Sequence, residues 1–355
     1  MAEKNRATGV DLGTMFFQVA ENGDKGEVKF KTVRNAFVEM AATDDIEETL
    51  KRNQWQYIKD GGHYYVIGED SLQVSKMFPG KIDIRRPMQD GVLNKDEDKK
   101  MVVVAQMIES AIGKAPDQNS WVCTCVSSES VDGSADSAFH RARLEAMFKR
   151  LGWNVKTIEE AQAVILAERP VAKQTDGTEV PYTGLGLSFG AGRANCVLSY
   201  KGMTVVGMSC ARSGDWIDKQ VAEQTGVPLA QVVSAKEKRL DFDNIDMDDD
   251  VLFALDTYYE RMLQYVFKNF AKKFAEVKSQ FDYPLDIVVA GGTSMPKGFA
   301  KKMEGIVRNL DLPFKIREVR MAKSPRNAVV EGLLISAVVA QKKHKNESLD
   351  DILNT

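Results

Sequence analysis

A glycine-containing segment near the N-terminus most constrains how this chain can fold. The segment, TGVDLGTMFFQVA at 8–20, places apolar residues on both sides of Gly13 and Thr14. This pattern predicts two antiparallel strands joined by a tight turn. The backbone N–H groups and the Thr14 hydroxyl at such a turn are donors suited to an anion. Asp11, which ends the first strand, is a candidate to hold a metal ion, directly or through water.

The same pattern recurs in the second half of the chain, at 183–198. When the two copies are aligned, three positions correspond: Gly9 with Gly186, Asp11 with Ser188, and Gly13 with Gly190. One copy alone is typical of an ordinary hairpin, but two copies heading two halves indicate a duplicated domain. Two such hairpins can face one another across a cleft and bind the phosphates of a nucleotide from both sides.

Composition narrows the class of protein. A chain of 355 residues predicts two domains of roughly 100–200 residues each. The formal net charge of -3 gives no support for direct nucleic-acid binding. Cys123 and Cys125 alternate within an apolar run, which indicates buried thiols and a reducing, cytoplasmic location. The three histidines are scattered, which argues against a histidine-based metal site, and no signal peptide or membrane-length apolar run is visible.

Strands and helices are expected to alternate along the chain. Strands are predicted at 28–38, 121–126, 155–158, 203–208 and 285–290, with a hairpin at 55–68. Helices are predicted at 96–114, 134–151, 159–168, 230–239, 251–278 and 327–341, with further helices beginning at 214 and 297. The polar tail is expected to be flexible, and its apolar residues Leu349, Ile352 and Leu353 are a candidate docking motif for a partner. The pattern predicts an α/β protein with two similar halves and a cleft between them.

The order of these motifs resembles that of the actin-like ATPase superfamily, in particular the bacterial and archaeal actins of the MreB and MamK type. The resemblance extends over about 9–337. Segments 10–14 and 186–193 look like the two phosphate loops, and RPMQDGV at 86–92 resembles the most specific motif of MreB. Gly332 resembles the second connector between the halves. The resemblance implies an actin-like fold, which is a duplicated ribonuclease H-like fold of two domains with a nucleotide cleft between them.

The resemblance also implies domain boundaries. Domain I is expected at 1–158, with a small β-rich subdomain at about 34–78. Domain II is expected at 159–324, with a reduced subdomain at about 214–256, because no long β-rich insertion follows residue 238. A helix at 325–341 is expected to return to domain I, and 342–355 is expected to form the flexible tail.

The resemblance implies roles for individual residues, with ATP and Mg²⁺ as cofactors. Glu160 resembles the glutamate that positions the attacking water, and Asp11 is implied in both catalysis and metal binding. Glu160 can equally be a helix-terminal glutamate that interacts with the helix dipole, and Gln162 lies close by as a substitute. The residues expected to bind the nucleotide are Gly13, Thr14, Met15, Gly190, Ala191, Gly192, Arg193, Gly214, Lys236, Glu237, Gly291, Gly292, Thr293 and Ser294.

The second phosphate loop departs from the pattern of its relatives. Ser188 stands where they carry an aspartate that holds the water shell of the magnesium ion, and a neutral hydroxyl lacks the charge that a hard cation favours. Ala191 and Arg193 also replace the usual small or hydroxyl residues, and Arg193 is a candidate to contact a phosphate as a fixed cation. Nucleotide binding is therefore better supported than hydrolysis.

Two functions remain open from the sequence. The first is an ATP-binding cytoskeletal protein that polymerises with itself, head to tail, into filaments. The second is a non-polymerising adaptor or scaffold that binds nucleotide without turnover, which Ser188 favours. A sugar kinase needs a catalytic aspartate beyond Asp11, and a chaperone needs a larger C-terminal domain. A membrane, through 77–79, or an adaptor protein is left open as a further partner, and no direct nucleic-acid binding is expected.

Overall fold

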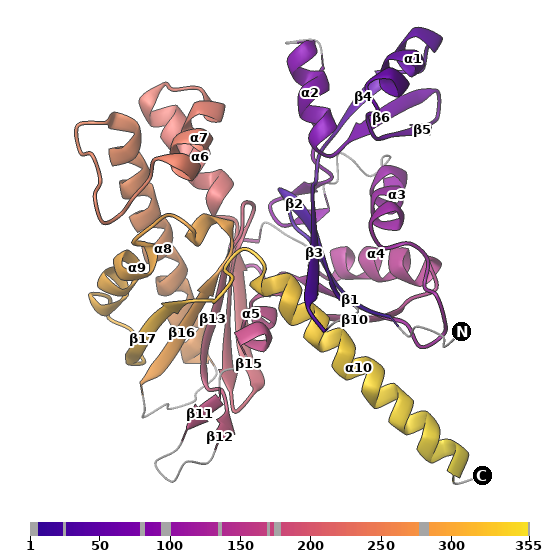
Figure 1. Ribbon diagram of the computed structural model, residues 1–355. Coiled ribbons are helices and arrows are strands. Elements are labelled where there is room, and N and C mark those ends of the chain that lie inside the picture. The colour runs from indigo at the N-terminus through magenta and orange to yellow at the C-terminus, as the bar shows by residue number, and fades with distance from the viewer. Residues whose placement is uncertain are drawn as a thin grey trace.

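The two halves of the protein lie side by side, each built on a five-stranded sheet (Figure 1). The computed structural model describes residues 6–23, 26–78, 82–93, 101–133, 137–168, 171–173, 179–276 and 284–353. The first sheet has the order β10-β9-β1-β2-β3. Its strands are β1 (Ala7–Leu12), β2 (Phe16–Asn22), β3 (Val28–Arg34), β9 (Trp121–Val126) and β10 (Asn154–Glu159).

The second sheet repeats the first. Its order is β17-β16-β13-β14-β15, so each of its strands corresponds to one in the first sheet. Its strands are β13 (Gly184–Phe189), β14 (Ala194–Tyr200), β15 (Met203–Cys210), β16 (Leu285–Ala290) and β17 (Ile316–Met321). In both sheets the central strand pairs antiparallel with the strand that follows it and parallel with the strand on its other side. The duplication predicted from the two glycine segments is confirmed.

A small subdomain extends from the first half. It contains β4 (Phe37–Ala41), α1 (Asp44–Arg52), β5 (Tyr57–Asp60), β6 (His63–Ile67) and α2 (Glu69–Met77). The single strand predicted at 28–38 is wrong, because the chain breaks between β3 and β4. At the break, the Asn35 backbone N–H donates to the Met15 carbonyl (2.9 Å) and its side-chain amide donates to the Gly13 carbonyl (2.7 Å). Asn35 thus ties the base of the subdomain to the first hairpin turn.

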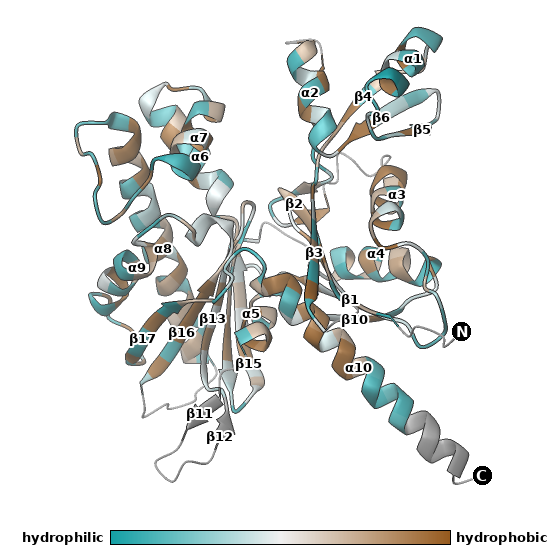
Figure 2. Cartoon of the chain, in the orientation of Figure 1, coloured by the Kyte–Doolittle hydropathy of each residue, from teal (hydrophilic) through white to brown (hydrophobic). Residues whose placement is uncertain are grey.

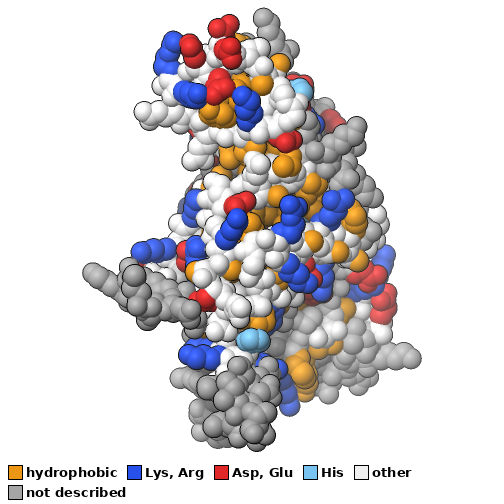
Figure 3. Space-filling view, turned by 90° about the vertical axis from the view of Figure 1, so that its right-hand side faces the viewer, with side chains coloured by type: hydrophobic (Ala, Val, Ile, Leu, Met, Phe, Trp, Pro, Cys, Tyr) orange, Lys and Arg blue, Asp and Glu red, His pale blue; other side chains and the backbone are white. Residues whose placement is uncertain are grey.

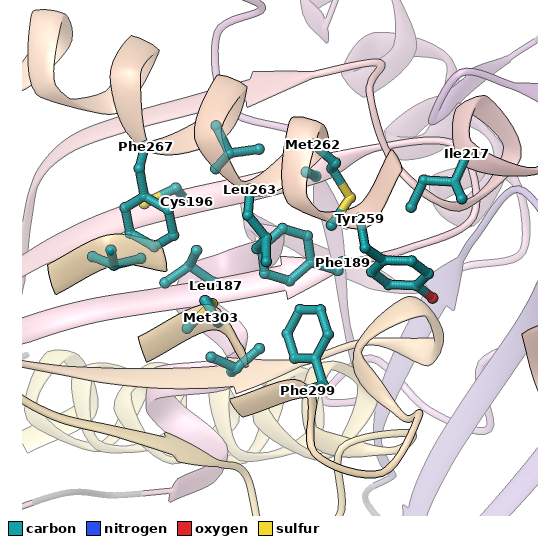
Figure 4. Packing of buried hydrophobic residues seen from close by; sticks show 14 of the residues in the cluster. Leu187, Phe189, Cys196, Ile217, Tyr259, Met262, Leu263, Phe267, Phe299 and Met303 are labelled. Atoms are coloured by element: carbon teal, nitrogen blue, oxygen red, sulfur yellow. The ribbon is translucent and has the colours of Figure 1, made fainter. Parts of the chain in front are cut away.

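Most of the remaining helices cover the sheets from outside or lie between them. The outer layer consists of α3 (Met101–Ile112), α4 (Ser137–Arg150), α8 (Asp250–Glu276) and α9 (Phe299–Arg308). Helices α6 (Gly214–Thr225) and α7 (Leu229–Lys238) lie at the upper end of the second half and pack against α8. Two short hairpins are formed by β7 (Met88–Gln89) with β8 (Val92–Leu93), and by β11 (Val171–Lys173) with β12 (Glu179–Pro181). The helices turn apolar faces towards the sheets (Figure 2). Figure 4 shows the core of the second half, where Phe189 of β13 packs with Tyr259 and Phe267 of α8 and Phe299 of α9.

Two helices lie between the sheets and connect the halves, α5 (Glu160–Glu168) and α10 (Ala328–Leu353). They cross at Gly332, where a Cβ atom would lie 1.8 Å from the Ala163 carbonyl oxygen. On the other face of α10, a Cβ on Gly9 would lie 2.4 Å from the backbone of Val330 and of Leu334. Only glycine permits these approaches.

Two elements differ from the prediction near the C-terminus. Strand β17 was not predicted, since IREVRM carries charged residues at 317, 318 and 320, which interrupt the alternation of apolar and polar residues. Helix α10 continues to Leu353, although we expected it to end at Gln341 and to be followed by a flexible tail. No glycine or proline follows Gly332, and the Lys and Gln residues after Ala340 are good helix formers, so nothing in the sequence stops the helix.

Candidate functional site

A cleft of about 700 Å³ lies between the two halves. All of the residues predicted to bind nucleotide, metal or water line this cleft, except Gly214 and Ser294. Gly214 lies immediately behind it, since a Cβ there would be 2.4 Å from the Thr293 hydroxyl. The Ser294 hydroxyl donates to the Gly291 carbonyl (2.7 Å) within the turn that follows β16.

The two hairpin turns have the same backbone geometry and touch one another. Gly13 N–H donates to the Phe16 carbonyl (3.0 Å), and its counterpart Gly190 N–H donates to the Arg193 carbonyl (2.9 Å). A Cβ atom on Gly192 would lie 2.4 Å from the Thr14 hydroxyl. The turns therefore approach each other as closely as a glycine permits, and residues of both turns line the cleft.

Two carboxylates face the cleft beneath these turns, Asp11 at the end of β1 and Glu160 at the start of α5. Burial raises the pKa of Glu160, and the neighbouring charge of Asp11 raises it further. Burial also raises the pKa of Asp11, against the opposing effect of the Cys125 thiol, which donates to Asp11 Oδ1 (3.5 Å). The site thus holds two acids whose charged forms are disfavoured in the absence of a cation.

Both oxygens of Glu160 accept a hydrogen bond from the second half. The Ser188 hydroxyl donates to Oε1 (2.7 Å), and the Asn195 amide donates to Oε2 (2.9 Å). Ser188 therefore occupies the place of the expected aspartate and fixes the orientation of Glu160.

This donor set fits a magnesium ion. Mg²⁺ is usually bound by one or two carboxylates together with water and phosphate oxygens, rather than by a cage of protein ligands. Asp11 and Glu160 supply the carboxylates, and a cation between them would stabilise the charged forms that burial disfavours. Within the described residues no cluster of three or more His, Cys, Asp or Glu side chains can hold a metal by itself. The phosphates of a nucleotide would therefore complete the site.

Arg193 is placed differently from our expectation of a contact with phosphate. Its side chain is buried, and its Nε donates to the Asp90 carbonyl in the β7–β8 turn of the first half (2.8 Å). Its Nη1 donates to the hydroxyls of Ser130 (3.2 Å) and Ser209 (2.9 Å). These contacts direct the guanidinium group to the junction of the two halves.

Lys236 also reaches the cleft with its ammonium group already engaged. Its Nζ donates to Asp218 Oδ2 (2.6 Å), an ion pair buried between α7 and α6. Lys236 and the adjacent Glu237 line the cleft from the second half. Gly291 lines it from the same half; it adopts a φ of +100°, and a Cβ there would lie 2.3 Å from the Phe189 carbonyl oxygen. Gly291 is therefore required by the close packing of two backbones, whereas a Cβ on Gly292 would meet nothing within 4 Å.

A family model described as Volactin matches residues 6–337. The chain belongs to the Volactin family. No curated protein matches it.

Solved structures similar to this Volactin-family chain include a MamK filament, MreB5 and EutJ. A MamK double helical filament has 19% identity, covers 93% of this chain and 98% of its own, and gives a TM-score of 0.67. MreB5 of Spiroplasma citri bound to AMPPNP has 15% identity, 97% and 99% coverage, and a TM-score of 0.68. The ethanolamine utilization protein EutJ from Carboxydothermus hydrogenoformans has 14% identity, 93% and 89% coverage, and a TM-score of 0.52. The fold is actin-like, as the order of the motifs predicted.

Among the residues that sequence reasoning missed in this Volactin-family chain are two equivalent amides of the hairpins, of which Gln18 lines the cleft. Gln18 pairs with Asp11 across the first hairpin, and Asn195 pairs with Ser188 across the second, so the two amides are equivalent under the duplication. Gln18 donates to Asn327 Oδ1 (3.4 Å) beside the start of α10, as Asn195 donates to Glu160 at the start of α5. The alignment of the two copies, continued by five residues past the glycines, would have found them.

The candidate membrane loop at 77–79 is only partly described. Met77 is exposed at the end of α2, whereas Phe78 packs against the core of the small subdomain. Pro79 lies outside the described residues. No helix in the described part of this Volactin-family chain combines the length and apolarity that crossing a bilayer requires. Leu349, Ile352 and Leu353 lie in the last turns of α10, where the side chains are not described.

Proposed function

We propose that this chain is an ATP-binding cytoskeletal protein that polymerises head to tail into filaments. The observation that carries the proposal is the pair of equivalent hairpin turns facing each other across the cleft, with Asp11 and Glu160 beneath them. The similarity to MreB5, solved with AMPPNP and with ADP, supports a nucleotide in this cleft. The similarity to a MamK double helical filament supports self-association.

Different cleft residues would bind the nucleotide and catalyse its hydrolysis, which we expect to be slow. The backbone N–H groups of the two turns would bind phosphate oxygens, and Asp11 with Glu160 would hold Mg²⁺, which when bound offsets the negative charge of the phosphates. Glu160 would orient the attacking water. Because Ser188 and Asn195 already donate to both of its oxygens, Glu160 is well oriented but has fewer acceptor positions left for the water. We therefore expect slow turnover.

The same hydrogen bonds favour the second candidate, an adaptor that binds nucleotide without turnover. With Ser188 in place of an aspartate, the second half offers Mg²⁺ a hydroxyl that is already bonded to Glu160. A site of this kind can retain a nucleotide as a structural element that holds the halves together. This adaptor would bind ATP and would form no filaments.

One experiment separates the two candidates. The purified protein is imaged by negative-stain electron microscopy with ATP and Mg²⁺, with ADP, and without nucleotide, while phosphate release is measured in parallel. We expect filaments with ATP. Filaments in every condition would mean that the nucleotide is not the switch, and tight ATP binding with no filaments in any condition would establish the adaptor.

The variant Glu160→Gln tests the assigned role of the carboxylate. It keeps the shape of the side chain and removes the charge that orients water, so phosphate release is expected to fall by about 10² or more. Binding of a fluorescent ATP analogue should change far less. Because Asn195 Oδ1 has no hydrogen-bond partner within the described residues, its amide can turn and accept from the amide introduced at position 160, which preserves the local structure. An unchanged rate of phosphate release would exclude Glu160 from catalysis.

A further inference from the structure

One loop of the first half pairs with the sheet of the second half. We call residues 128–132 of this loop the strap. It follows β9 and precedes α4, both of which belong to the first half. Its partner is β15, which lies at the edge of the second sheet. The strap is therefore a connection between the halves in addition to the helices α5 and α10.

The strap binds to β15 through its backbone. Ser130 forms an isolated parallel bridge with Ser209. The Ser209 N–H donates to the Glu129 carbonyl (2.8 Å), and the Ser209 carbonyl accepts from the Val131 N–H (2.9 Å). The Glu129 carboxylate also pairs with Lys273 of α8 (3.0 Å). The strap thus satisfies backbone groups that an edge strand otherwise leaves open.

Further hydrogen bonds fix both ends of the strap. At its start, the Ser209 hydroxyl donates to the Ser128 carbonyl (2.7 Å). At its end, the Ala211 N–H donates to Asp132 Oδ2 (2.7 Å). Between them, the half-buried Val131 packs against the core of the second half. A contact made of one apolar side chain and a few hydrogen bonds can open while both halves stay folded.

Arg193 links the strap with the second hairpin turn of the cleft. It follows Gly192 directly, and its carbonyl accepts the Gly190 N–H that closes the turn (2.9 Å). Its Nη1 donates to both hydroxyls of the bridge, that of Ser130 (3.2 Å) and that of Ser209 (2.9 Å). The same residue therefore belongs to the turn that faces the cleft and to the contact between the strap and β15.

We propose that the strap is a latch, which is closed when a nucleotide holds the two hairpin turns together and is released when the cleft opens. This inference rests on the proposed nucleotide binding and adds the segment that couples the cleft to the contact between the halves. Because the strap is covalently part of the first half, separation of the halves at this level breaks its bonds to β15. A nucleotide that favours the closed halves and a latch that forms only in the closed halves stabilise each other by the same factor.

Hydrogen exchange tests the latch in the wild-type protein. The Val131 and Ser209 amides are the backbone donors of the bridge, and their exchange is followed at single-residue resolution by mass spectrometry. We expect ATP with Mg²⁺ to slow the exchange of both amides about fivefold or more. Helix α1 lies at the top of the molecule in Figures 1 and 3, away from the second half, and its amides are the control. They should exchange equally with and without ATP.

Two results of this experiment would overturn the latch. Equal exchange of the Val131 and Ser209 amides with and without ATP would show that the strap does not respond to the nucleotide. An equal slowing of the bridge amides and of the amides in α1 would show a general stabilisation of the fold.

A matched pair of variants tests the same coupling from the other direction. Val131→Pro removes the N–H that donates to Ser209, whereas Val131→Ala loses similar packing and keeps that N–H. We expect the Kd of a fluorescent ATP analogue to be about fivefold or more higher for Val131→Pro than for Val131→Ala. Asp132→Ala, which removes the acceptor of the Ala211 N–H, leaves the backbone intact and should raise the Kd about two- to threefold. This variant keeps the test valid if Val131→Pro does not fold.

The outcomes separate the latch from the proposed function. If wild type binds the ATP analogue and the strap variants bind it as tightly as wild type does, the latch is wrong although nucleotide binding stands. If wild type binds no ATP analogue, the proposed function fails and the latch fails with it.

Discussion

At the scale of single residues, the two duplicated hairpins carry different side chains at equivalent positions. The first hairpin places the carboxylate Asp11 opposite the amide Gln18, and the second places the hydroxyl Ser188 opposite the amide Asn195. One half therefore offers a ligand for a cation, whereas the other offers two donors that hold Glu160. This division makes Ser188 the position whose substitution most directly changes the response of the site to magnesium.

Ser188→Asp is expected to make the stability of the protein depend on Mg²⁺. In EDTA the new carboxylate would face Glu160 at hydrogen-bond distance, and like-charge repulsion with the loss of a donor should lower the apparent free energy of unfolding by about 2–4 kcal/mol. With Mg²⁺ and ADP much of that loss should be recovered. Thermal unfolding of the variant and of wild type, in EDTA and in Mg²⁺ with ADP, measures this loss and its recovery.

Ser188→Ala is the control, because it removes the donor without adding charge. The free energy of unfolding of this variant should be lower than that of wild type by about 1 kcal/mol, both in EDTA and in Mg²⁺ with ADP. Equal responses of the aspartate and alanine variants to Mg²⁺ would show that no cation binds beside position 188.

His140 gives the site a pH dependence of known sign. It is buried on α4, its Nδ1 accepts a hydrogen bond from Leu93 N–H (3.3 Å), and burial lowers its pKa to about 4. The unfolded chain therefore binds a proton near pH 6.5 that the folded protein does not bind until about pH 4. The free energy of unfolding consequently decreases as the pH is lowered from about 6.5 to about 4. Between pH 7 and pH 5 this group should lower the free energy of unfolding by about 2 kcal/mol.

His140→Asn isolates that contribution, since the amide oxygen can accept the same N–H and does not titrate. The difference in stability between wild type and variant, measured by urea unfolding at both pH values, removes the opposing effect of Asp11 and Glu160, whose raised pKa values favour the folded state at lower pH. A difference that is constant with pH would mean that His140 becomes protonated in the folded protein.

At the scale of elements, the crossing of α5 and α10 holds the two sheets at a fixed distance. Both helices pack their small residues together, and Gly332 leaves no room for a methyl group against Ala163. The helices also begin at the two positions that receive the Gln18 and Asn195 amides. The connectors are thus tied to both hairpins, so their spacing sets the width of the cleft.

Gly332→Ala should therefore destabilise the protein and also weaken nucleotide binding. Its Cβ would lie 1.8 Å from a backbone carbonyl oxygen that cannot move without shifting α5, so we expect a loss of about 3 kcal/mol or more in the free energy of unfolding. Gly305→Ala in α9 is the matched control, because a Cβ there meets nothing within 4 Å. It should be neutral or stabilising by up to about 1 kcal/mol. If both substitutions changed the free energy of unfolding equally, the close crossing of α5 and α10 would not limit the residue at position 332.

Much of this architecture could be predicted, because its signals are local. The two hairpins, the buried strands and the long apolar helices each carry their own periodicity, and the order of the motifs identified the cleft. Strand β17 was missed because its burial depends on α9 and β16, which lie elsewhere in the sequence. The contacts of Arg193 were missed for the same reason, since Asp90 and Ser130 approach it only in the folded chain.

At the scale of the whole molecule, the two halves are joined by two arginine contacts. Arg86 Nη1 lies 2.9 Å from Asp215 Oδ2 at the start of α6, and Arg193 donates back to the Asp90 carbonyl. One arginine from each half thus reaches the other half. These contacts hold the two halves together beside the hairpins, so the arginines should act on the opening of the halves, and with it on nucleotide release, more than on the chemistry.

Arg86→Asp is expected to speed the release of nucleotide, because it replaces an attraction to Asp215 with a repulsion and favours the open cleft. The pair is partly exposed, so the effect is modest, and we expect the dissociation rate of a fluorescent ATP analogue to rise about 3- to 10-fold in a stopped-flow displacement experiment. Adding Asp215→Arg restores an opposite pair and should bring the rate back to within about twofold of wild type. Arg317→Ala breaks the ion pair with Asp286 inside the second half and should leave the rate unchanged. If the double variant releases nucleotide as fast as the single variant, the contact between the halves does not control opening, and the barrier to release lies at the hairpin turns themselves.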